Sequence, residues 1–312
     1  MPQEQVTVVI PAYRAAESIE RAVLSAFAQP GVSCRVIVVV DDEEGTTEAA
    51  LAALAALADE RLTVLTNPGN MGAQKSRNRG LAAVESDWVM FLDSDDFIMG
   101  DLLPSLVQAL EQGTDVAFGP WLLLDESRGR AERHQERYAD AADLLDRWLV
   151  RRQWTPPCAV LWRTAFLRRI GGWKESVRRN QDGEVVCRAL LAGARPGHSA
   201  RGCGVYVQHD SPHRISQARS TFGDLIAVAD SLLEQPTEAV EEARRRKILG
   251  DYFYWLADSA FRRGDREQGR RARQRAVELG GSLPMGSRLP RLGAAVLGLE
   301  TYRRAVSWAT KP

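Results

Sequence analysis

Residues 88–96 read Trp-Val-Met-Phe-Leu-Asp-Ser-Asp-Asp, an apolar run that ends in three acids within four positions. The apolar part, Trp88 to Leu92, predicts a buried strand. Like charges this close repel one another unless a cation compensates them. The acids therefore predict a site for Mg²⁺ or Mn²⁺ that is shared with the phosphates of a substrate. Capping of a following helix explains the acids alone equally well.

The chain before this run alternates between two patterns. Three continuous apolar runs predict buried strands, at 6–10, 35–40 and 62–65. Three segments predict helices, at 15–28, 46–57 and 72–84. Pro11 is expected to end the first strand. This alternation predicts an α/β fold, with a mostly parallel, Rossmann-like sheet flanked by helices.

Polar residues follow the predicted strands at the points where the strands end. In parallel sheets of this kind, ligands bind at the carboxyl ends of the strands. We therefore expect residues that are far apart in the sequence to line one cleft: Tyr13, Asp41, Asn70 and Asp93 to Asp96.

Two of these segments have a chemical interpretation beside a structural one. Asp41 and Asp42 are suited to accept hydrogen bonds from a base or a ribose, and capping of the helix predicted from Thr46 explains them as well. The loop 70–72 leads into a helix whose N-terminus favours anions, and Arg77 is placed to reach a phosphate. A solvated basic helix face is the alternative, and the GxxxxGK[ST] pattern of a P-loop is absent.

The alternation weakens after residue 102. One strand is expected at 115–124 and another at 202–209, with helices at 140–150 and 182–191 and a Gly-Gly-Trp turn at 171–173. From about Leu225 the chain has helical patterns only, including amphipathic helices at 248–262 and 266–279 joined at Gly264. We therefore predict an α/β domain at 1–220 and a helical C-terminal extension at 221–312.

Composition narrows the class of protein. The chain has 41 Lys and Arg against 41 Asp and Glu, so its net charge is zero, and nucleic acid is not an expected partner. Its four cysteines are far apart without CxxC spacing, which predicts free thiols rather than a zinc site. We see no leader sequence and no apolar stretch of about 18 residues, which predicts a cytoplasmic protein.

Arginines are frequent in the C-terminal region. The runs at 244–247, 262–263 and 270–271 are expected to be solvated helix faces. Between 288 and 308, arginines alternate with Leu, Val, Tyr and Trp, which suits a helix at a membrane surface. Peripheral contact with the inner face of the membrane and formation of a homodimer are the two interpretations of this helix.

Six segments in this order resemble the inverting glycosyltransferases of the GT-A fold that are called family 2. They are Val8-Val-Ile-Pro-Ala-Tyr13, Val38-Val-Val-Asp41-Asp42, the stretch Asn70 to Asn78, Phe91 to Asp96, Gly171-Gly-Trp173-Lys-Glu175, and Gln181-Asp182. The resemblance covers residues 6–216. Two positions depart from the family: Glu43 begins a loop where Gly-Ser is usual, and Gln181 stands where Glu is usual.

The resemblance implies roles for single residues. Asp182 would be the catalytic base that deprotonates an acceptor hydroxyl. Asp95 and His209 would bind the metal, Mn²⁺ or Mg²⁺, which with Arg77 would stabilise the leaving diphosphate. Tyr13 would stack on the nucleobase. The substrate-binding residues implied in this way are Pro11, Tyr13, Asp41, Asn70, Gly72, Arg77, Asp93, Ser94, Trp173 and Gln181.

Structural roles are the alternatives for three of these residues. Asp182 suits a cap of the helix that ends at Leu191, and Trp173 suits a core position. His209 suits a structural position at a strand end, and His213 and Arg214 compete with it as the ligand.

The resemblance thus implies a metal-dependent transferase that moves a sugar from a nucleotide diphosphate, with UDP expected, to an acceptor hydroxyl. The acceptor would be a glycan, a lipid-linked sugar or a small molecule, in polysaccharide or other glycan biosynthesis. A sugar nucleotidyltransferase is an alternative that would require a Gly-rich loop after the first strand, and 11–15 lack it. Gln181 and the loop at Glu43 favour a second alternative, a non-catalytic module that binds nucleotide sugars.

Overall fold

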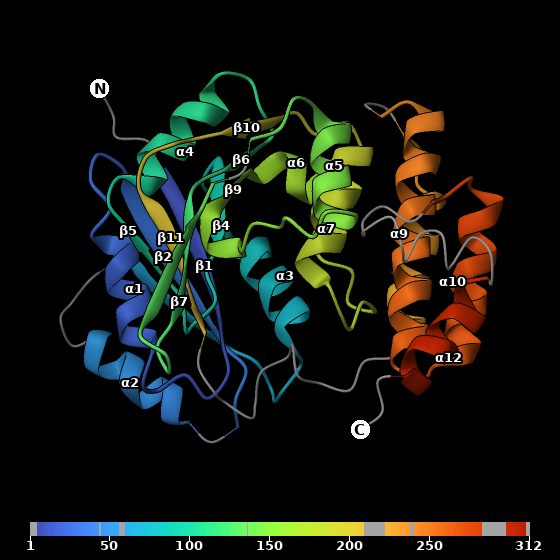
Figure 1. Cartoon of the computed structure of the whole chain (residues 1–312). Coiled ribbons are helices and arrows are strands. Elements are labelled where there is room, and N and C mark those ends of the chain that lie inside the picture. Colours follow the sequence, from blue (N-terminus) through green and yellow to red (C-terminus); the bar gives the residue numbers. More distant parts are fainter. Residues whose placement is uncertain are drawn as a thin grey trace. The chain divides into compact units, whose positions relative to one another are not determined.

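The computed structural model of the chain (Figure 1) describes residues 5–43, 45–55, 60–135, 137–208, 222–237, 240–282 and 298–309. The chain forms two compact units whose segments alternate along the sequence. The first, here called the sheet unit, comprises Met1–Tyr138, Thr155–Glu175 and Ala194–His213. The second, the helical unit, comprises Ala139–Trp154, Ser176–Gly193 and Arg214–Pro312. A single domain boundary near residue 220 stays a prediction.

The sheet unit is built on a seven-stranded sheet of order β10-β6-β9-β4-β1-β2-β3. Strand β9 is antiparallel to both neighbours and the other pairs are parallel. The mostly parallel α/β sheet predicted from the sequence is confirmed. The strands are β1 (Gln5–Ala12), β2 (Ser33–Val40), β3 (Leu62–Thr66), β4 (Trp88–Phe91), β6 (Val116–Phe118), β9 (Val160–Arg163) and β10 (Pro196–His198).

Helices cover both faces of the central strands, which explains why these strands read as continuous apolar runs. Successive strand residues point to opposite faces. Val8 and Ile10 of β1 belong to a core that includes residues of α1 (Ile19–Phe27) and α4 (Leu102–Glu111). Val9 faces α3 (Ala73–Ala83): a Cβ atom at Gly80 would stand 2.3 Å from Val9 Cγ1. Glycine at position 80 therefore lets α3 pack closely on the sheet.

Strand β1 continues past Pro11, which the sequence predicted as its end. Ala12 still pairs with Val40 of β2, whereas pairing with β4 ends at Val9. The carbonyl of Val9 points toward β4, where it accepts from Leu92, and Pro11 lies two residues on, on the same edge of the strand. The proline is tolerated because its missing N–H would face the side where the partner strand has ended.

The segment 115–124 forms two strands instead of the one predicted. β6 belongs to the large sheet, and β7 (Trp121–Asp125) belongs to a second sheet of order β5-β11-β7-β8. The break falls at Gly119 and Pro120. Proline cannot donate to a ladder, and a Cβ atom at Gly119 would stand 2.6 Å from Leu102 Cδ1. The other strands are β5 (Phe97–Met99), β8 (Arg130–His134) and β11 (Cys203–Gln208).

The remaining helices of the sheet unit are short or lie at its edge. They are α2 (Thr46–Ala55), the 3₁₀ turn Pro157–Ala159 and α6 (Thr164–Arg169).

The helical unit is centred on α9 (Glu242–Arg262), which lies side by side with α10 (Arg266–Glu278) (Figure 1). Gly264, with φ +81°, turns the chain between them. The two predicted amphipathic helices are confirmed, and α9 begins earlier than predicted. Tyr252 and Phe253 of α9 are fully buried. The other helices are α5 (Ala141–Leu149), α7 (Gln181–Leu191), α8 (Phe222–Leu233) and α12 (Leu299–Ala309).

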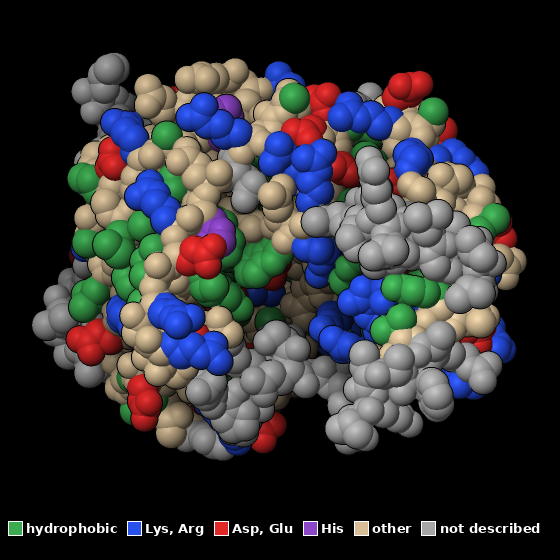
Figure 2. All heavy atoms as spheres, viewed as in Figure 1, with side chains coloured by type: hydrophobic (Ala, Val, Ile, Leu, Met, Phe, Trp, Pro, Cys, Tyr) green, Lys and Arg blue, Asp and Glu red, His purple; other side chains and the backbone are tan. Residues whose placement is uncertain are grey.

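The arginine runs are only partly the solvated faces that the sequence predicted. Arg245 is buried and pairs with Glu242 at 2.6 Å, while Arg270 of α10 binds Glu300 of α12 at 2.9 Å. On the face shown in Figure 2, basic and acidic side chains are interspersed. An exposed ion pair such as Arg270–Glu300 stabilises a fold only slightly.

Three other expectations concern the whole chain. All four cysteines are free thiols, as predicted. Within the described ranges, no helix is both long and apolar enough to cross a bilayer. The proposed surface helix at 288–308 is described only from residue 298 on, as part of α12, so the membrane and dimer interpretations stay predictions.

Candidate active site

Asp41 follows β2 and holds the loop that leads into α3. The buried carboxylate accepts hydrogen bonds from the backbone N–H groups of Met71 and Gly72, each at 2.8 Å, on different oxygens. Oδ1 also accepts from Asn67 Nδ2 at 2.6 Å. The loop that contains Asn70 is therefore fixed at the carboxyl edge of the sheet. This arrangement requires the positive φ of Gly72, +90°.

Asp42 ties a second loop to the same edge. Its Oδ2 atom accepts from the Thr47 hydroxyl and from the backbone N–H of Arg14 at 3.2 Å. Asp42 thus joins the loop after β1 to α2. Tyr13 in that loop is 40% exposed, and the Arg14 guanidinium lies 5.3 Å from the centre of its ring. An exposed ring of this kind suits the predicted stacking on a base.

Arg77 of α3 is buried and forms an ion pair with Asp93, at 2.6 Å from Nη2 to Oδ1. The Arg77 side chain is 4% exposed and that of Asp93 is 30% exposed. The guanidinium also lies 5.7 Å from the centre of the Trp173 ring, and that ring packs 4.2 Å from Phe91. The structure therefore brings together Arg77, Asp93 and Trp173 from three distant segments.

The acidic run after β4 does not cap a helix, because β5 follows it. Asp96 is buried, and its Oδ1 atom accepts from the backbone N–H of Val207 at 2.8 Å, which ties the run to β11. Ser94 and Asp95 lie half-buried in a turn that is closed by a 3.0 Å hydrogen bond from Asp96 N to Asp93 O. Of the three acids, Asp96 therefore has a structural role.

The carboxylates of Asp93 and Asp95 suit a hard divalent cation such as Mg²⁺ or Mn²⁺. Such ions are bound by one or two carboxylates, with substrate phosphates and water as the remaining ligands. Over the part of the chain that is described, no cluster of three His, Cys, Asp or Glu side chains could hold a metal. Two carboxylates fit a metal whose other ligands are the oxygens of a diphosphate and of water. His209, the other predicted ligand, lies outside the described residues.

Asn78 positions the Gly-Gly-Trp turn, a role that was not predicted. Its side chain accepts from Trp173 N at 2.9 Å and donates to Trp173 O at 2.8 Å. Gly172 makes room for this contact: a Cβ atom there would stand 2.6 Å from Asn78 Oδ1. The sequence feature that could have indicated this role is the Arg-Asn pair at 77–78. Arg77 binds Asp93, and the next residue, Asn78, binds the backbone of Trp173.

Gln181 and Asp182 begin α7 in the helical unit. The N-cap is Asn180, in a left-handed conformation with φ +56°, so Asp182 lies inside the first turn rather than at the cap. A negative charge is favoured there by the helix dipole. Glu184 and Arg188 follow as a buried ion pair with contacts of 2.8 and 2.9 Å, which secures the helix that carries Asp182.

Comparisons with known proteins show what the chain is similar to. The family described as Glycosyl transferase family 2 matches residues 7–170. The succinoglycan biosynthesis protein ExoU of Rhizobium meliloti (strain 1021) is 30% identical over 265 residues, which is 79% of this chain and 76% of ExoU. ExoO of the same organism is 37% identical over 103 residues, 33% of this chain, and the match spans only 29% of ExoO.

Solved structures show the same fold. S. aureus TarS 1–349 in complex with UDP-GlcNAc has a TM-score of 0.72 at 19% identity, over 98% of this chain and 92% of that chain. The mannosyltransferase PcManGT from Pyrobaculum calidifontis, in complex with GDP-Man and Mn²⁺, has a TM-score of 0.62 at 18% identity, over 98% and 88%. The GT-A fold expected from the sequence is confirmed.

Proposed function

Because the chain belongs to glycosyltransferase family 2, we propose that it is a metal-dependent inverting transferase that uses a nucleotide diphosphate sugar. The observation that carries the proposal is the 2.6 Å ion pair between the buried Arg77 and the half-buried Asp93, beside the loop held by Asp41. A guanidinium with its planar set of donors suits a diphosphate. UDP is the proposed nucleotide, with support from the UDP-GlcNAc bound to TarS.

Each part of the sheet edge has a role in donor binding under this proposal. Tyr13 stacks on the base and Asp41 bonds to it, while Pro11 and Ser94 contribute to the pocket. Asn70 and Gly72 lie at the N-terminus of α3, which favours the negative charge of the diphosphate. The Trp173 ring packs against the Arg77 guanidinium. Gln181, next to Asp182 in the sequence, is proposed to contact the acceptor.

Asp95, with Asp93, would hold Mn²⁺ or Mg²⁺. Such a metal, when bound, neutralises charge on the leaving diphosphate. The carboxylate chemistry of these two residues supports the assignment, as does the Mn²⁺ in the PcManGT complex.

Asp182 is the proposed general base. It takes the proton from the acceptor hydroxyl, whose oxygen then attacks the anomeric carbon from the face opposite the diphosphate. One displacement inverts the configuration at that carbon. The acceptor is proposed to be a growing surface polysaccharide or a related glycan, with support from the similarity to ExoU.

The test compares UDP-, GDP- and dTDP-sugars with Mn²⁺, by thermal shift and by hydrolysis of the donor. The wild type should be stabilised by one nucleotide class only when metal is present, and Asp95→Ala should abolish that dependence. Asp182→Asn should bind the donor and lose turnover by about 10²-fold or more. Asp87→Asn, an exposed acid before β4, is the matched control.

Failure of every nucleotide to stabilise the wild type would refute the proposal. If the wild type binds a nucleotide sugar but transfers it to none of the acceptors, the chain is instead a non-catalytic binding module.

A further inference from the structure

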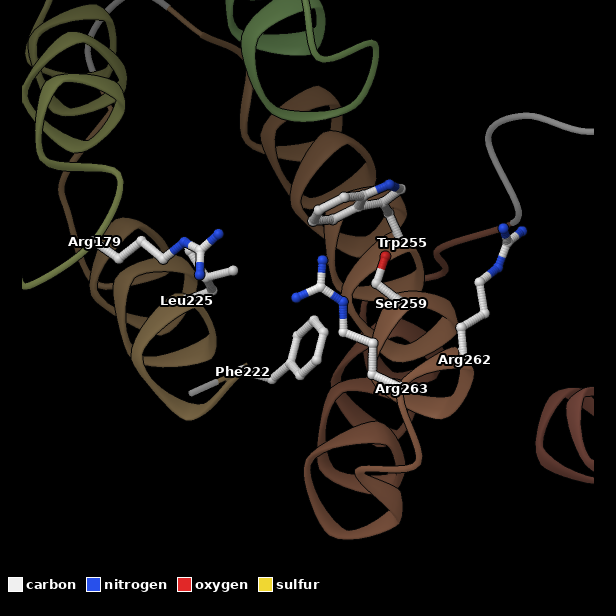
Figure 3. Close-up of a pocket in the computed structure, with 7 residues that line it drawn as sticks. All are labelled: Arg179, Phe222, Leu225, Trp255, Ser259, Arg262 and Arg263. Carbon is white, nitrogen blue, oxygen red and sulfur yellow. The ribbon is translucent and has the colours of Figure 1, made fainter. Parts of the chain in front are cut away.

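The cavity of about 210 Å³ in the helical unit (Figure 3) is lined by aromatic rings that lie close to arginines of the same chain. The Arg152 guanidinium lies 4.5 Å from the centre of the Trp255 ring, and that of Arg263 lies 5.7 Å from the centre of the Phe222 ring. These contacts already occupy ring surface that a stacked ligand would use. Exposed apolar side chains of the sheet unit offer a clearer site.

Two of these exposed side chains flank Asp41. Strands β1, β2 and β3 are neighbours in the large sheet, in that order. Tyr13 directly follows β1, Asp41 directly follows β2, and Met71 belongs to the loop between β3 and α3. Asp41 therefore occupies the middle position, with the loop of Tyr13 on one side of it and the loop of Met71 on the other.

Hydrogen bonds fix these three segments to one another. The backbone N–H of Asp41 donates to Ala12 O at 2.8 Å, and that of Asn67 donates to Val40 O at 2.8 Å. The backbone N–H of Met71 donates to Asp41 Oδ1, also at 2.8 Å. The side chain of Met71 thus begins next to the Asp41 carboxylate.

Both flanking side chains are exposed although they are large and apolar. Tyr13 is 40% exposed, even with the Arg14 guanidinium 5.3 Å from the centre of its ring, and Met71 is 41% exposed. Single exposed apolar residues are common on proteins, but two of them on either side of one buried carboxylate form a local pattern. Apolar surface around a few polar groups is typical of a site for a small organic ligand.

A nucleobase that bonds to Asp41 through its edge turns its two faces toward the flanking loops. Tyr13 is assigned above to one of these faces. A methionine thioether is polarizable and flexible, so it packs favourably against an aromatic ring without requiring one fixed geometry. Met71 is therefore suited to the face that Tyr13 leaves open.

We propose that Met71 packs on the face of the nucleobase opposite Tyr13, so that the base is held between a ring and a thioether. The proposal rests on the proposed function. The thioether contact adds affinity for the base, while the hydrogen bond to Asp41 selects among bases. The backbone N–H of Met71, which holds the loop to Asp41, is kept in any substitution except proline.

Timed oxidation with hydrogen peroxide tests the proposal in the wild type. The peroxide transfers one oxygen atom to the thioether, which becomes a sulfoxide, and is itself reduced to water. Met99 of β5, which is 47% exposed and has no assigned part in donor binding, is the matched control. With Mg²⁺ and UDP at about ten times its Kd, oxidation of Met71 should slow roughly tenfold, because only the free protein reacts. Mass spectrometry should show no change in the rate at Met99.

Inorganic pyrophosphate separates contact with the base from closure of the loop. It resembles the diphosphate of the donor but has no base, so Met71 should oxidise as fast with bound pyrophosphate as without ligand. Calorimetry verifies that the pyrophosphate is bound. Protection of Met71 by pyrophosphate would mean that the loop itself covers the side chain, and would overturn the proposal.

Substitutions supply the second measurement. Met71→Ala should weaken UDP binding about fivefold, because apolar contact area with the base is lost. Met71→Leu, of similar volume, should bind UDP within about twofold of the wild type. Met99→Ala should bind UDP as the wild type does, and pyrophosphate should bind equally to all of these proteins. In the transfer reaction, Met71→Ala should raise the KM for the donor about fivefold and leave kcat nearly unchanged.

The outcomes distinguish this contact from the donor site itself. If UDP does not bind the wild type, the proposed function fails. If UDP binds but Met71 stays as reactive as before, or if UDP binds Met71→Ala as tightly as the wild type, the methionine contact is refuted and the donor site stands.

Discussion

Three carboxylates at the edge of the sheet have three different kinds of partner. Asp41 accepts from the backbone of the loop before α3, Asp93 from the guanidinium of Arg77, and Asp96 from the backbone of β11. Substitution of each therefore has a different consequence: a loosened loop, a buried guanidinium without its charge partner, or a weakened link between the two sheets.

Asp93→Asn should lower the free energy of unfolding by about 1.5–3 kcal/mol, because a charge-assisted hydrogen bond to the buried Arg77 is lost. Urea unfolding measures this change. Asp87→Asn, at an exposed position nearby, should stay within about 0.5 kcal/mol of the wild type. Equal stability of the two variants would mean that the ion pair contributes nothing to the fold.

Thiol reactivity should follow burial. Burial raises the pKa of the Cys34 thiol to about 12, against a smaller opposite effect of the Arg61 charge. Burial also raises the pKa of Cys158 and Cys187, and that of the half-buried Cys203. A raised pKa means less thiolate, so at pH 8 Cys34 should react roughly 10³-fold more slowly than an ordinary thiol.

Mass spectrometry after timed labelling with a maleimide checks this prediction. Cys203 should be modified first, and all four cysteines should react at similar rates in urea. Rapid labelling of Cys34 in the folded protein would show that β2 opens locally.

The sequence predicted that these carboxylates lie at one edge of the sheet, because each follows a predicted strand and the carboxyl ends of parallel strands meet there. It did not predict their partners. Asp41 binds a residue 30 positions away and Asp96 one 111 positions away, and local patterns carry no information about such pairs. The role of Asn78, which holds the backbone of Trp173 through two hydrogen bonds and is here called the Asn78 clamp, was missed for the same reason.

At the scale of elements, the strands and helices up to residue 92 were predicted to within a few residues, because each is a buried apolar run or a repeating helical pattern. Two of the errors lie at proline. Pro11 lies inside β1, whereas Pro120 separates β6 from β7. Whether a proline ends a strand depends on whether the neighbouring strand would accept a hydrogen bond from the N–H that proline lacks.

The turn at 171–173 offers a matched pair of substitutions. Gly171 and Gly172 both have positive φ, +84° and +60°, but only a Cβ atom at 172 meets Asn78 Oδ1. Gly171→Ala should cost about 1 kcal/mol from backbone strain. Gly172→Ala should cost about 2–4 kcal/mol, because it also disrupts the clamp on Trp173.

Chemical denaturation and tryptophan fluorescence measure both effects. Donor affinity should fall in Gly172→Ala more than in Gly171→Ala, since Trp173 lies against Arg77. Equal effects of the two substitutions would argue against the Asn78 clamp.

At the scale of the whole molecule, the chain divides into two units whose segments alternate along the sequence, and α5 and α7 belong to the helical unit. The domain boundary predicted at residue 220 stays a prediction. Patterns along the chain show where elements begin and end, but not which distant elements share a core.

A fragment comprising residues 1–220 should fold poorly. It lacks α8 and α9, against which α7 and α5 pack, so α5 and α7 would lose part of the surface that buries their apolar residues. Compared with the full chain, the fragment should bind a hydrophobic dye more strongly and melt less cooperatively. A fragment that melts as sharply as the full chain would support the boundary at 220.

The alternating segments also affect how the protein folds during synthesis and how its two units could be exchanged by recombination. The chain passes from one unit to the other after residues 138, 154, 175, 193 and 213. During synthesis, the sheet unit cannot be completed until β11 leaves the ribosome, and at that point α8 and α9, against which α7 and α5 pack, have not yet emerged. A single recombination crossover therefore cannot exchange one unit without also exchanging part of the other.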